Sequence, residues 1–346
     1  MSARVMSVLE TYSPTQELYS IDEAFLDFTD LYPGRQDPFA YAQQIKRSVQ
    51  RQVGIPVCVG LGPTKTLAKL ANFAAKKWPK TGGVVNLSDP DRREKLMKIV
   101  PVDEVWGIGR QLAQQLNGLG IRTVWDLAKQ SPQKMQQRFS IVMARTIMEL
   151  NGISCLDLET VAPAKQQIVC SRTFGRRLTS YAELHAAMAE FTSRACEKLR
   201  QQQSVAGQVS VFIRTNGFAL HEPQYQRQAS RCLVFPASDT RVILATVESL
   251  LSSVYHSGFG YYKCGVQLGD ISPALAPNQL DLFDDRAGAG KADGRVMQTV
   301  DAINRRYPKG IAVAAAWIDQ NWKPRAHCLS PRYTTSWREL PIVHCR

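Results

Sequence analysis

The alternation and periodicity of apolar residues divide the first part of the chain into short strands and amphipathic helices. Apolar residues recur at helical spacing before residue 12, between 38 and 53, and between 64 and 78. Shorter apolar runs at 55–61 and 82–87 are bounded by glycine and proline and predict strands. The chain therefore mixes helices with short strands, which indicates an α+β architecture.

Residues 17–28 contain two apolar runs that flank a pair of adjacent carboxylates, Asp22 and Glu23. This pattern predicts a β-hairpin with Ser20 to Glu23 at its tight end. On a straight strand the two carboxylates would point to opposite faces, but at a turn both can approach one divalent cation. Mg²⁺ is usually held by one or two protein carboxylates together with substrate phosphates. A solvated Asp-Glu turn is the simpler interpretation of the dipeptide taken alone.

The predicted helix at 64–78 carries lysines along one side. Its polar sector contains Lys65, Lys69, Asn72 and Lys76, and its apolar residues fill the opposite sector. One interpretation is a solvated face of a helix that packs on the core. The other is a phosphate site, in which the Gly62-Pro63 turn leaves the helix amides free and Lys65 and Lys69 supply charge to a triphosphate.

Two glycine turns between residues 101 and 129 predict a helix-hairpin-helix, with two short helices on either side of a Gly-x-Gly turn. The first turn is Gly107-Ile108-Gly109, and the second is Gly118-Leu119-Gly120-Ile121. Such turns expose backbone amides to phosphates and grip DNA without reading its sequence. The candidate DNA contacts here are Gly107, Ile108, Gly109 and Arg110.

Residues 167–270 show the order strand, helix, strand, strand, helix, strand of a ferredoxin-like domain. The predicted strands also carry four cations, Arg172, Arg214, Arg231 and Lys263. They predict one basic sheet face, with Arg172 and Arg214 as candidate DNA contacts. Charges that keep a sheet soluble explain the same pattern equally well.

An apolar-aromatic peptide follows this region, beside a stretch rich in glycine and alanine. It contains Gln279, Leu280, Leu282 and Phe283. Such a peptide suits docking into the groove of a partner, and the alternative is a tail folded onto its own domain. The last fifty residues contain three tryptophans and are expected to be ordered, but no chemistry can be inferred from them.

Composition narrows the choice of partner and compartment. The 346 residues carry a formal net charge of +13, which points to a polyanion, and first of all to nucleic acid. No apolar run approaches the roughly 18 residues of a membrane span, and no signal peptide is evident. The eight cysteines are dispersed without a Cys-x-x-Cys, which predicts reduced thiols in the cytoplasm.

Five stretches of the chain, taken in order, resemble the Y-family translesion DNA polymerases, and most closely the UmuC-type catalytic subunits of bacterial DNA polymerase V. The resemblance covers the whole chain, and its motifs are residues 19–25, 59–69, 105–109, 279–283 and 329–335. It implies a partial polymerase palm at 1–100, a helical thumb with the helix-hairpin-helix at 101–165, a ferredoxin-like little finger at 166–275, a clamp-binding peptide and linker at 276–295, and a UmuC-type C-terminal region at 296–346.

The resemblance also implies the chemistry and the partners. Asp22 and Glu23 would be catalytic ligands of Mg²⁺, and Lys69, with Lys65, would bind the incoming deoxynucleoside triphosphate. The substrate would be primer-template DNA, including damaged DNA. The peptide at Gln279, Leu280, Leu282 and Phe283 would bind the sliding clamp. A processed UmuD-type dimer and RecA would be further partners, and no membrane is implied.

The family's palm begins with a strand that carries a metal-binding aspartate, and a small fingers domain follows it. Residues 1–6 align instead with a helix well inside the palm. With two carboxylates in place of three, we expect this chain alone to be inactive in DNA synthesis and its palm sheet to lack a central strand. Two alternatives stay open: a DNA- and clamp-binding remnant without synthesis, and a nucleotide cyclase. A cyclase needs no grip on DNA, so the helix-hairpin-helix argues against it.

Overall fold

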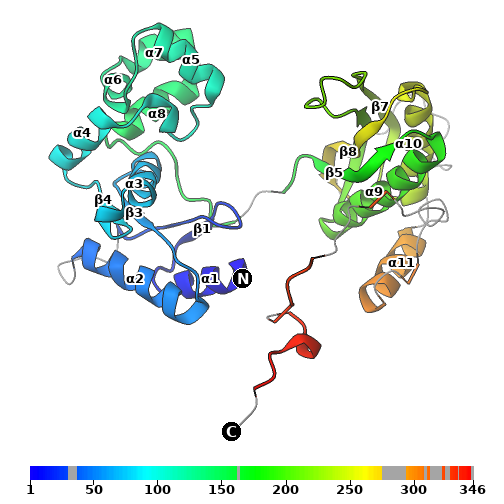
Figure 1. Ribbon diagram of the computed structural model, residues 1–346, viewed down its shortest axis with the longest axis horizontal. Helices are drawn as coiled ribbons and strands as arrows, with labels where there is room; N and C mark the ends of the chain where they lie inside the picture. The colour runs from blue at the N-terminus through cyan, green and yellow to red at the C-terminus, as the bar shows by residue number, and fades with distance from the viewer. Residues whose placement is uncertain are drawn as a thin grey trace. The chain divides into compact units, whose positions relative to one another are not determined.

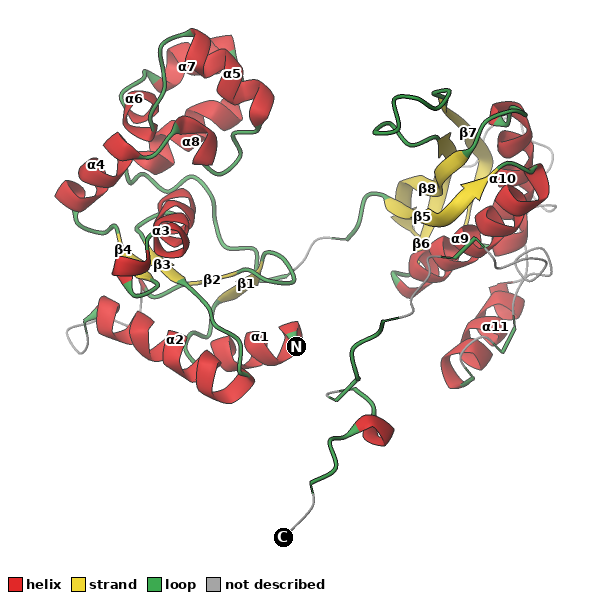
Figure 2. Ribbon diagram, in the orientation of Figure 1, coloured by secondary structure: helices red, strands yellow, loops and turns green. Residues whose placement is uncertain are grey.

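The computed structural model describes residues 1–29, 37–161, 164–274, 294–307, 310–311, 322–323, 328–333 and 335–343. The chain divides into two compact units, Met1–Ala162 and Pro163–Arg346. Both units mix helices and strands (Figures 1 and 2), so the predicted α+β, multidomain class is confirmed. Each unit is described by itself below.

The first unit begins with a helix, the predicted hairpin and a second helix. These elements are α1 (Ser2–Glu10), β1 (Gln16–Leu18), β2 (Ala24–Leu26) and α2 (Pro38–Val53). The hairpin is antiparallel, with Leu18 opposite Ala24. Val8, Ile45 and Val49 form a small core where the two helices meet. The hairpin therefore lies where the sequence predicts it.

A parallel strand pair follows, and a helix connects its two strands. The elements are β3 (Val59–Leu61), α3 (Lys65–Lys77) and β4 (Val84–Asn86). β3 packs against α2 and α3 (Figure 2). A Cβ atom built on Gly60 would lie 2.2 Å from the backbone nitrogen of Asn72, so α3 touches the backbone of β3 directly. In the described part of the chain this pair and the hairpin form two separate two-stranded sheets.

The rest of the first unit is helical. It contains α4 (Pro90–Ile99), a 3₁₀ turn η3 (Val102–Glu104), α5 (Arg110–Gly118), α6 (Val124–Ala128), α7 (Pro132–Arg138) and α8 (Ile141–Leu150). One apolar core runs from Leu67 of α3 to Leu150 of α8. The first glycine turn, at Gly107, lies between α4 and α5, with η3 directly before it. The second turn, which contains Gly120 at φ +81°, lies between α5 and α6. Each turn thus has a helix on either side, and the first of these helices ends just before residue 101, where the predicted motif begins.

The second unit confirms the predicted order of strands and helices. Its elements are β5 (Ile168–Leu178), α9 (Tyr181–Gln201), β6 (Ser204–Arg214), β7 (Gln226–Ala237), α10 (Thr240–Val254) and β8 (Tyr261–Pro273). The antiparallel sheet has the order β5-β8-β6-β7, so each helical crossover skips one strand. Both helices pack on one face over a core that includes Phe191, Val211 and Leu251, and no described helix covers the other face.

The strand register divides the four basic residues between the two faces of this sheet. Arg214 lies opposite Lys263 on the face that no described helix covers. Arg172 lies opposite the buried Cys264, and Arg231 lies opposite the buried Val209, so both have the parity of the helix-covered face. The prediction of a single basic face is therefore wrong, although the exposed Arg172 and Arg214 both remain accessible.

The C-terminal region is anchored to this unit at two points. Its helix α11 (Gly294–Arg306) places Asp301 against Arg200 of α9, with oxygen–nitrogen distances of 2.6 and 2.7 Å. Trp322 is buried between the rings of Phe174 and Phe191. A 3₁₀ turn, η5 (Trp337–Glu339), lies near the end of the chain. No described helix has the length and apolarity that crossing a bilayer requires.

The close contact at Gly60 gives a first prediction. Gly60→Ala should lower the free energy of unfolding by about 3 kcal/mol, because the new methyl group meets backbone atoms that cannot turn away. Urea unfolding followed by circular dichroism measures this change. Gly118→Ala is the control, since a Cβ there meets nothing within 4 Å. Equal stability of the two variants would contradict the packing described here.

Candidate active site

The tight end of the hairpin is closed by its own hydrogen bonds. The Ser20 amide donates to the Glu23 carbonyl at 3.0 Å, and the Ser20 hydroxyl donates to the Asp22 carboxylate at 2.5 Å. This hydroxyl is the main reason that the pKa of Asp22 lies below its ordinary value, and Lys76 and Lys69 lower it further. Asp22 is exposed. The turn therefore presents an ionised carboxylate to the solvent.

Glu23, the second carboxylate, faces helix α3. Its oxygens lie 2.6 Å from the Lys69 ammonium and 3.7 Å from that of Lys76. Lys69 also lies over the Tyr19 ring, 4.9 Å from its centroid. The lysine side of α3 thus packs against the hairpin. It is not simply a face exposed to solvent, because its Lys69 is paired with a carboxylate.

Lys65 belongs to the same side of α3 but is enclosed more completely. Its ammonium lies 2.5 Å from the Glu17 carboxylate and donates to the Asp157 carbonyl at 3.0 Å. The Phe25 ring centroid is 5.0 Å away. Glu17 is itself buried and accepts a second hydrogen bond, from the Glu159 amide at 2.9 Å. Lys65 and Glu17 thus tie α3, the hairpin and the segment after α8 together.

Two of the amides at the start of α3, where one interpretation of the sequence places a phosphate, are engaged within the chain. The Thr64 hydroxyl accepts from the Leu67 amide at 3.2 Å, and the Glu149 carboxylate accepts from the Thr66 amide at 3.0 Å. The same carboxylate accepts from the Cys155 amide at 2.7 Å and is fully buried. Glu149 therefore supplies the anion that the helix N-terminus favours.

The first glycine turn is joined to the hairpin through aromatic side chains. The indole N–H of Trp106 donates to the Tyr19 hydroxyl at 3.1 Å. The Tyr19, Phe25 and Trp106 rings lie 5.5 to 5.8 Å apart between centroids. These separations are typical of favourable aromatic pairs. Trp106 directly precedes Gly107, so the turn that was predicted to bind the DNA backbone begins next to this cluster of three rings.

The turn itself leaves backbone groups open. Gly107 has φ +88°, a conformation that favours glycine, and a Cβ on Gly107 or Gly109 would meet nothing within 4 Å. No side chain caps α5, whose first residue, Arg110, is exposed. Ile108 is buried in the core and anchors the turn. The uncapped start of α5 and Arg110 suit a phosphate. The Ile108 side chain does not, and the Ile108 amide already donates to the Val105 carbonyl at 2.9 Å.

The carboxylates fit a divalent cation only in part. No group of three or more His, Cys, Asp or Glu side chains that could hold a metal occurs among the described residues. Asp22 is ionised and open, but Glu23 is paired with Lys69. Asp27 accepts from the Thr29 amide and hydroxyl, at 2.9 and 2.6 Å, and so belongs to its own turn. Asp22 and Glu23 can supply the one or two protein ligands that Mg²⁺ takes when substrate phosphates complete its shell.

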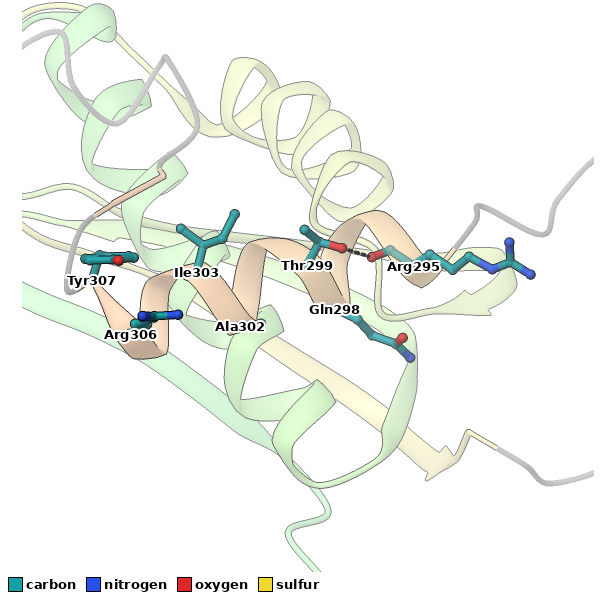
Figure 3. Close-up of a pocket in the computed structure, with 7 residues that line it drawn as sticks. All are labelled: Arg295, Gln298, Thr299, Ala302, Ile303, Arg306 and Tyr307. Atoms are coloured by element: carbon teal, nitrogen blue, oxygen red, sulfur yellow. Dashed lines mark hydrogen bonds between the residues drawn. The ribbon is translucent and has the colours of Figure 1, made fainter.

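The remaining candidates lie elsewhere. Arg172 and Arg214 belong to the second unit, and Gln279, Leu280, Leu282 and Phe283 lie outside the described residues. The second unit also has a surface hollow on α11 and the residue after it (Figure 3), lined by Arg295, Gln298, Thr299, Ala302, Ile303, Arg306 and Tyr307. The structure therefore brings Asp22 and Glu23 together with Lys69, and it pairs Lys65 with Glu17 of the same hairpin. Sequence reasoning missed Glu17 and Glu149, although an acid within the apolar helix at 141–150 was a usable signal for the latter.

Comparison with known proteins gives matches along most of the chain. The family models that match are the impB/mucB/samB family at residues 1–72, the IMS family HHH motif at 89–121, the impB/mucB/samB family C-terminal domain at 165–282, and a domain of unknown function at 294–343. These matches include the hairpin, both glycine turns and the four-stranded sheet.

Similar proteins include UmuC of Salmonella typhimurium, which is 44% identical over 98% of this chain and 80% of its own length. MucB of Escherichia coli is 41% identical, with 99% and 80% covered. DNA polymerase IV of Pelotomaculum thermopropionicum is 27% identical, with 88% and 72% covered. A solved chimeric Y-family DNA polymerase, Dbh-Dpo4(243-245)-Dbh, shares the fold with a TM-score of 0.59 at 21% identity, covering 79% of this chain and 75% of its own.

The Ser20 hydroxyl gives a prediction about the acidity of Asp22. Ser20→Ala should raise the pKa of Asp22 toward its ordinary value of 3.8, because the hydrogen bond to the ionised form is lost. As the solution is acidified, the Asp22 carboxylate of this variant would become protonated at a higher pH than that of the unmodified protein. An NMR titration of the side-chain carboxyl carbon measures this pKa.

Thr29→Ala is the matched control, because the Thr29 hydroxyl lowers the pKa of Asp27 in the same way. That variant should raise the pKa of Asp27 and leave the titration of Asp22 unchanged. If Ser20→Ala did not move the Asp22 titration, the hydrogen bond would not be what keeps this carboxylate acidic.

Proposed function

This chain belongs to the impB/mucB/samB family of Y-family DNA polymerases, and from that premise we propose that it serves translesion DNA synthesis in SOS mutagenesis. The reaction is template-directed nucleotidyl transfer, in which a primer 3′-hydroxyl attacks the α-phosphate of a deoxynucleoside triphosphate on damaged DNA. Family membership rests on relatives that are 40–44% identical over nearly the whole chain.

The observation that carries the catalytic part is the geometry of the hairpin turn. It holds an exposed, ionised Asp22 next to a Glu23–Lys69 pair. A cation bound by Asp22 and Glu23 would compete with Lys69 for the Glu23 oxygens. Lys69 would then be available to the negative phosphates of the nucleotide. Carboxylates and a lysine at one turn are what a metal-dependent phosphoryl-type transfer requires.

Mg²⁺ is the proposed cation, and when bound it stabilises the charge on the attacking and leaving oxygens. Asp22 and Glu23 hold it, and Lys69 neutralises phosphate charge. The aromatic cluster of Tyr19, Phe25 and Trp106 keeps the hairpin from moving away from the glycine turn. Positioning of this kind accounts for much of the catalysis in such reactions.

We propose that the first glycine turn and α5 bind the DNA backbone through amides and Arg110. In the second unit Arg172 and the Arg214–Lys263 pair add charge for phosphates. The domain limits proposed from the sequence, at 100, 165, 275 and 295, are retained as part of this proposal. The net charge of +13 supports a polyanionic substrate.

Further partners are proposed by resemblance. They are the sliding clamp at Gln279, Leu280, Leu282 and Phe283, a processed UmuD-type dimer, and RecA. We place the protein in the cytoplasm, where its seven described cysteines, all free thiols, would stay reduced.

A second candidate function is DNA and clamp binding without synthesis. It is favoured by the Lys69 contact on Glu23, which leaves Asp22 as the open carboxylate of the turn. Primer extension separates the two candidates. DNA binding that weakens steeply with salt, without any extension by the complete gene product, would support the second.

Replacing Asp22 tests the catalytic proposal. Asp22→Asn in the complete gene product should lower single-nucleotide extension about 10²- to 10³-fold, because it removes a charged cation ligand and keeps the size of the side chain. DNA affinity should stay within about twofold. Asp27→Asn, at a carboxylate bound to Thr29, is the control and should retain activity. Normal extension by Asp22→Asn would refute the metal role.

The clamp peptide gives a separate prediction. Replacing Leu282 and Phe283 with alanine should weaken clamp binding at least about 30-fold, since buried apolar anchors carry most of the affinity of such peptides. Surface plasmon resonance with immobilised clamp measures the change. Asp281→Ala, at the neighbouring polar position, is the control and should bind nearly normally. Equal binding by the double variant would show that the clamp docks elsewhere.

A further inference from the structure

Two lysines one helical turn apart on α3 face the hairpin, but their surroundings differ. The Lys65 side chain is 12% exposed, and its Glu17 partner is 8% exposed. The Lys69 side chain is 19% exposed, and its Glu23 partner is 26% exposed. The first pair is therefore the more enclosed of the two, and separating buried charges costs more than separating exposed ones.

Glu17 also has fewer alternative partners than Glu23. If Lys69 turned toward a phosphate, Glu23 would still have Lys76 at 3.7 Å. If Lys65 turned away, the contacts described for Glu17 would leave it only the Glu159 amide. A buried carboxylate without a cation is strongly unfavourable. Lys69 can therefore leave its partner for a ligand, whereas Lys65 cannot.

Lys65 also joins three parts of the chain. Its ammonium binds Glu17 of the hairpin and the carbonyl of Asp157. Glu17 binds the amide of Glu159. The segment after α8 is thus fastened to α3 and to the hairpin. Its attachment point on the hairpin, Glu17, lies five residues before Asp22 in the sequence. Any loosening here would let the turn move relative to Lys69.

We propose that Glu17 and Lys65 are positioning residues that fasten the hairpin and the segment at 155–159 to α3, and that, of the two lysines, Lys69 is the one that offers its charge to the phosphates of the nucleotide. This assignment rests on the proposed function for the role of Lys69. It removes Lys65 from the nucleotide-binding residues predicted from the sequence. It also gives Glu17 a role that depends on its ion pair and not on contact with a substrate.

The test compares Lys65→Met with Lys69→Met in the complete gene product, since methionine keeps the length of the side chain and removes its charge. The first measurement is amide hydrogen exchange at Glu159. Lys65→Met should speed this exchange at least about tenfold, because the segment loses its fastening, and Lys69→Met should leave it unchanged.

The second measurement is the steady-state kinetics of single-nucleotide insertion. Lys65→Met should lower kcat about tenfold or more while KM for the nucleotide stays within about threefold. Lys69→Met should instead raise KM about tenfold or more. If Lys65→Met proves too unstable to assay, Glu17→Gln combined with Lys65→Met removes both charges and should melt at a higher temperature than Lys65→Met alone.

The proposal is overturned if Lys65→Met raises KM as much as Lys69→Met does while exchange at Glu159 stays slow. That outcome would make Lys65 a phosphate ligand. It is also overturned if the double variant melts no higher than the single one. Absence of insertion by the unmodified protein would count against the proposed function, and hydrogen exchange and melting would then still decide the role of Lys65.

Discussion

The site in this protein depends on the pairing of the α3 lysines with the carboxylates of the hairpin. A two-stranded hairpin is marginally stable by itself. This hairpin shares no sheet hydrogen bonds with the β3–β4 pair among the described residues. Lys65–Glu17 and Lys69–Glu23 hold it on α3 instead. Because these pairs engage Glu17 and Glu23, Asp22 at the tip is the carboxylate that stays open.

The position of α3 follows from its own constraints. Gly60 lets the helix touch the backbone of β3, and Glu149 neutralises its N-terminus from within α8. These two contacts fix α3 along one side and at its N-terminus, and neither of them involves the hairpin. Trp106 then joins the hairpin to the glycine turn proposed to bind DNA. Chemistry at Asp22 and the grip on DNA at α5 are thus connected through a short series of packed side chains.

Much of this arrangement could be predicted from the sequence where local signals are strong. Helix α2 has the predicted limits because Asp37 caps it at its start and Gly54, at φ +79°, ends it. The spacing of the lysines on α3 showed which residues share a side. It could not show the partner, because Glu17 is distant in sequence and no periodicity connects the two.

Other features depend on register and on tertiary contact. The single basic sheet face was predicted wrongly because Arg172 alternates with its own strand's buried residues on the helix-covered side, whereas Arg214 stands on the other side of its strand. Glu149 looked like one acid in an apolar helix, and its role depends on the Thr66 and Cys155 amides.

The central claim is that Asp22 is the open cation ligand of a hairpin fixed on α3. Titrating Mn²⁺ into ¹⁵N-labelled protein tests this claim most directly. Paramagnetic broadening should begin at the amides of residues 20–24 and disappear in Asp22→Asn, whereas broadening that begins elsewhere, or persists in that variant, would contradict the account.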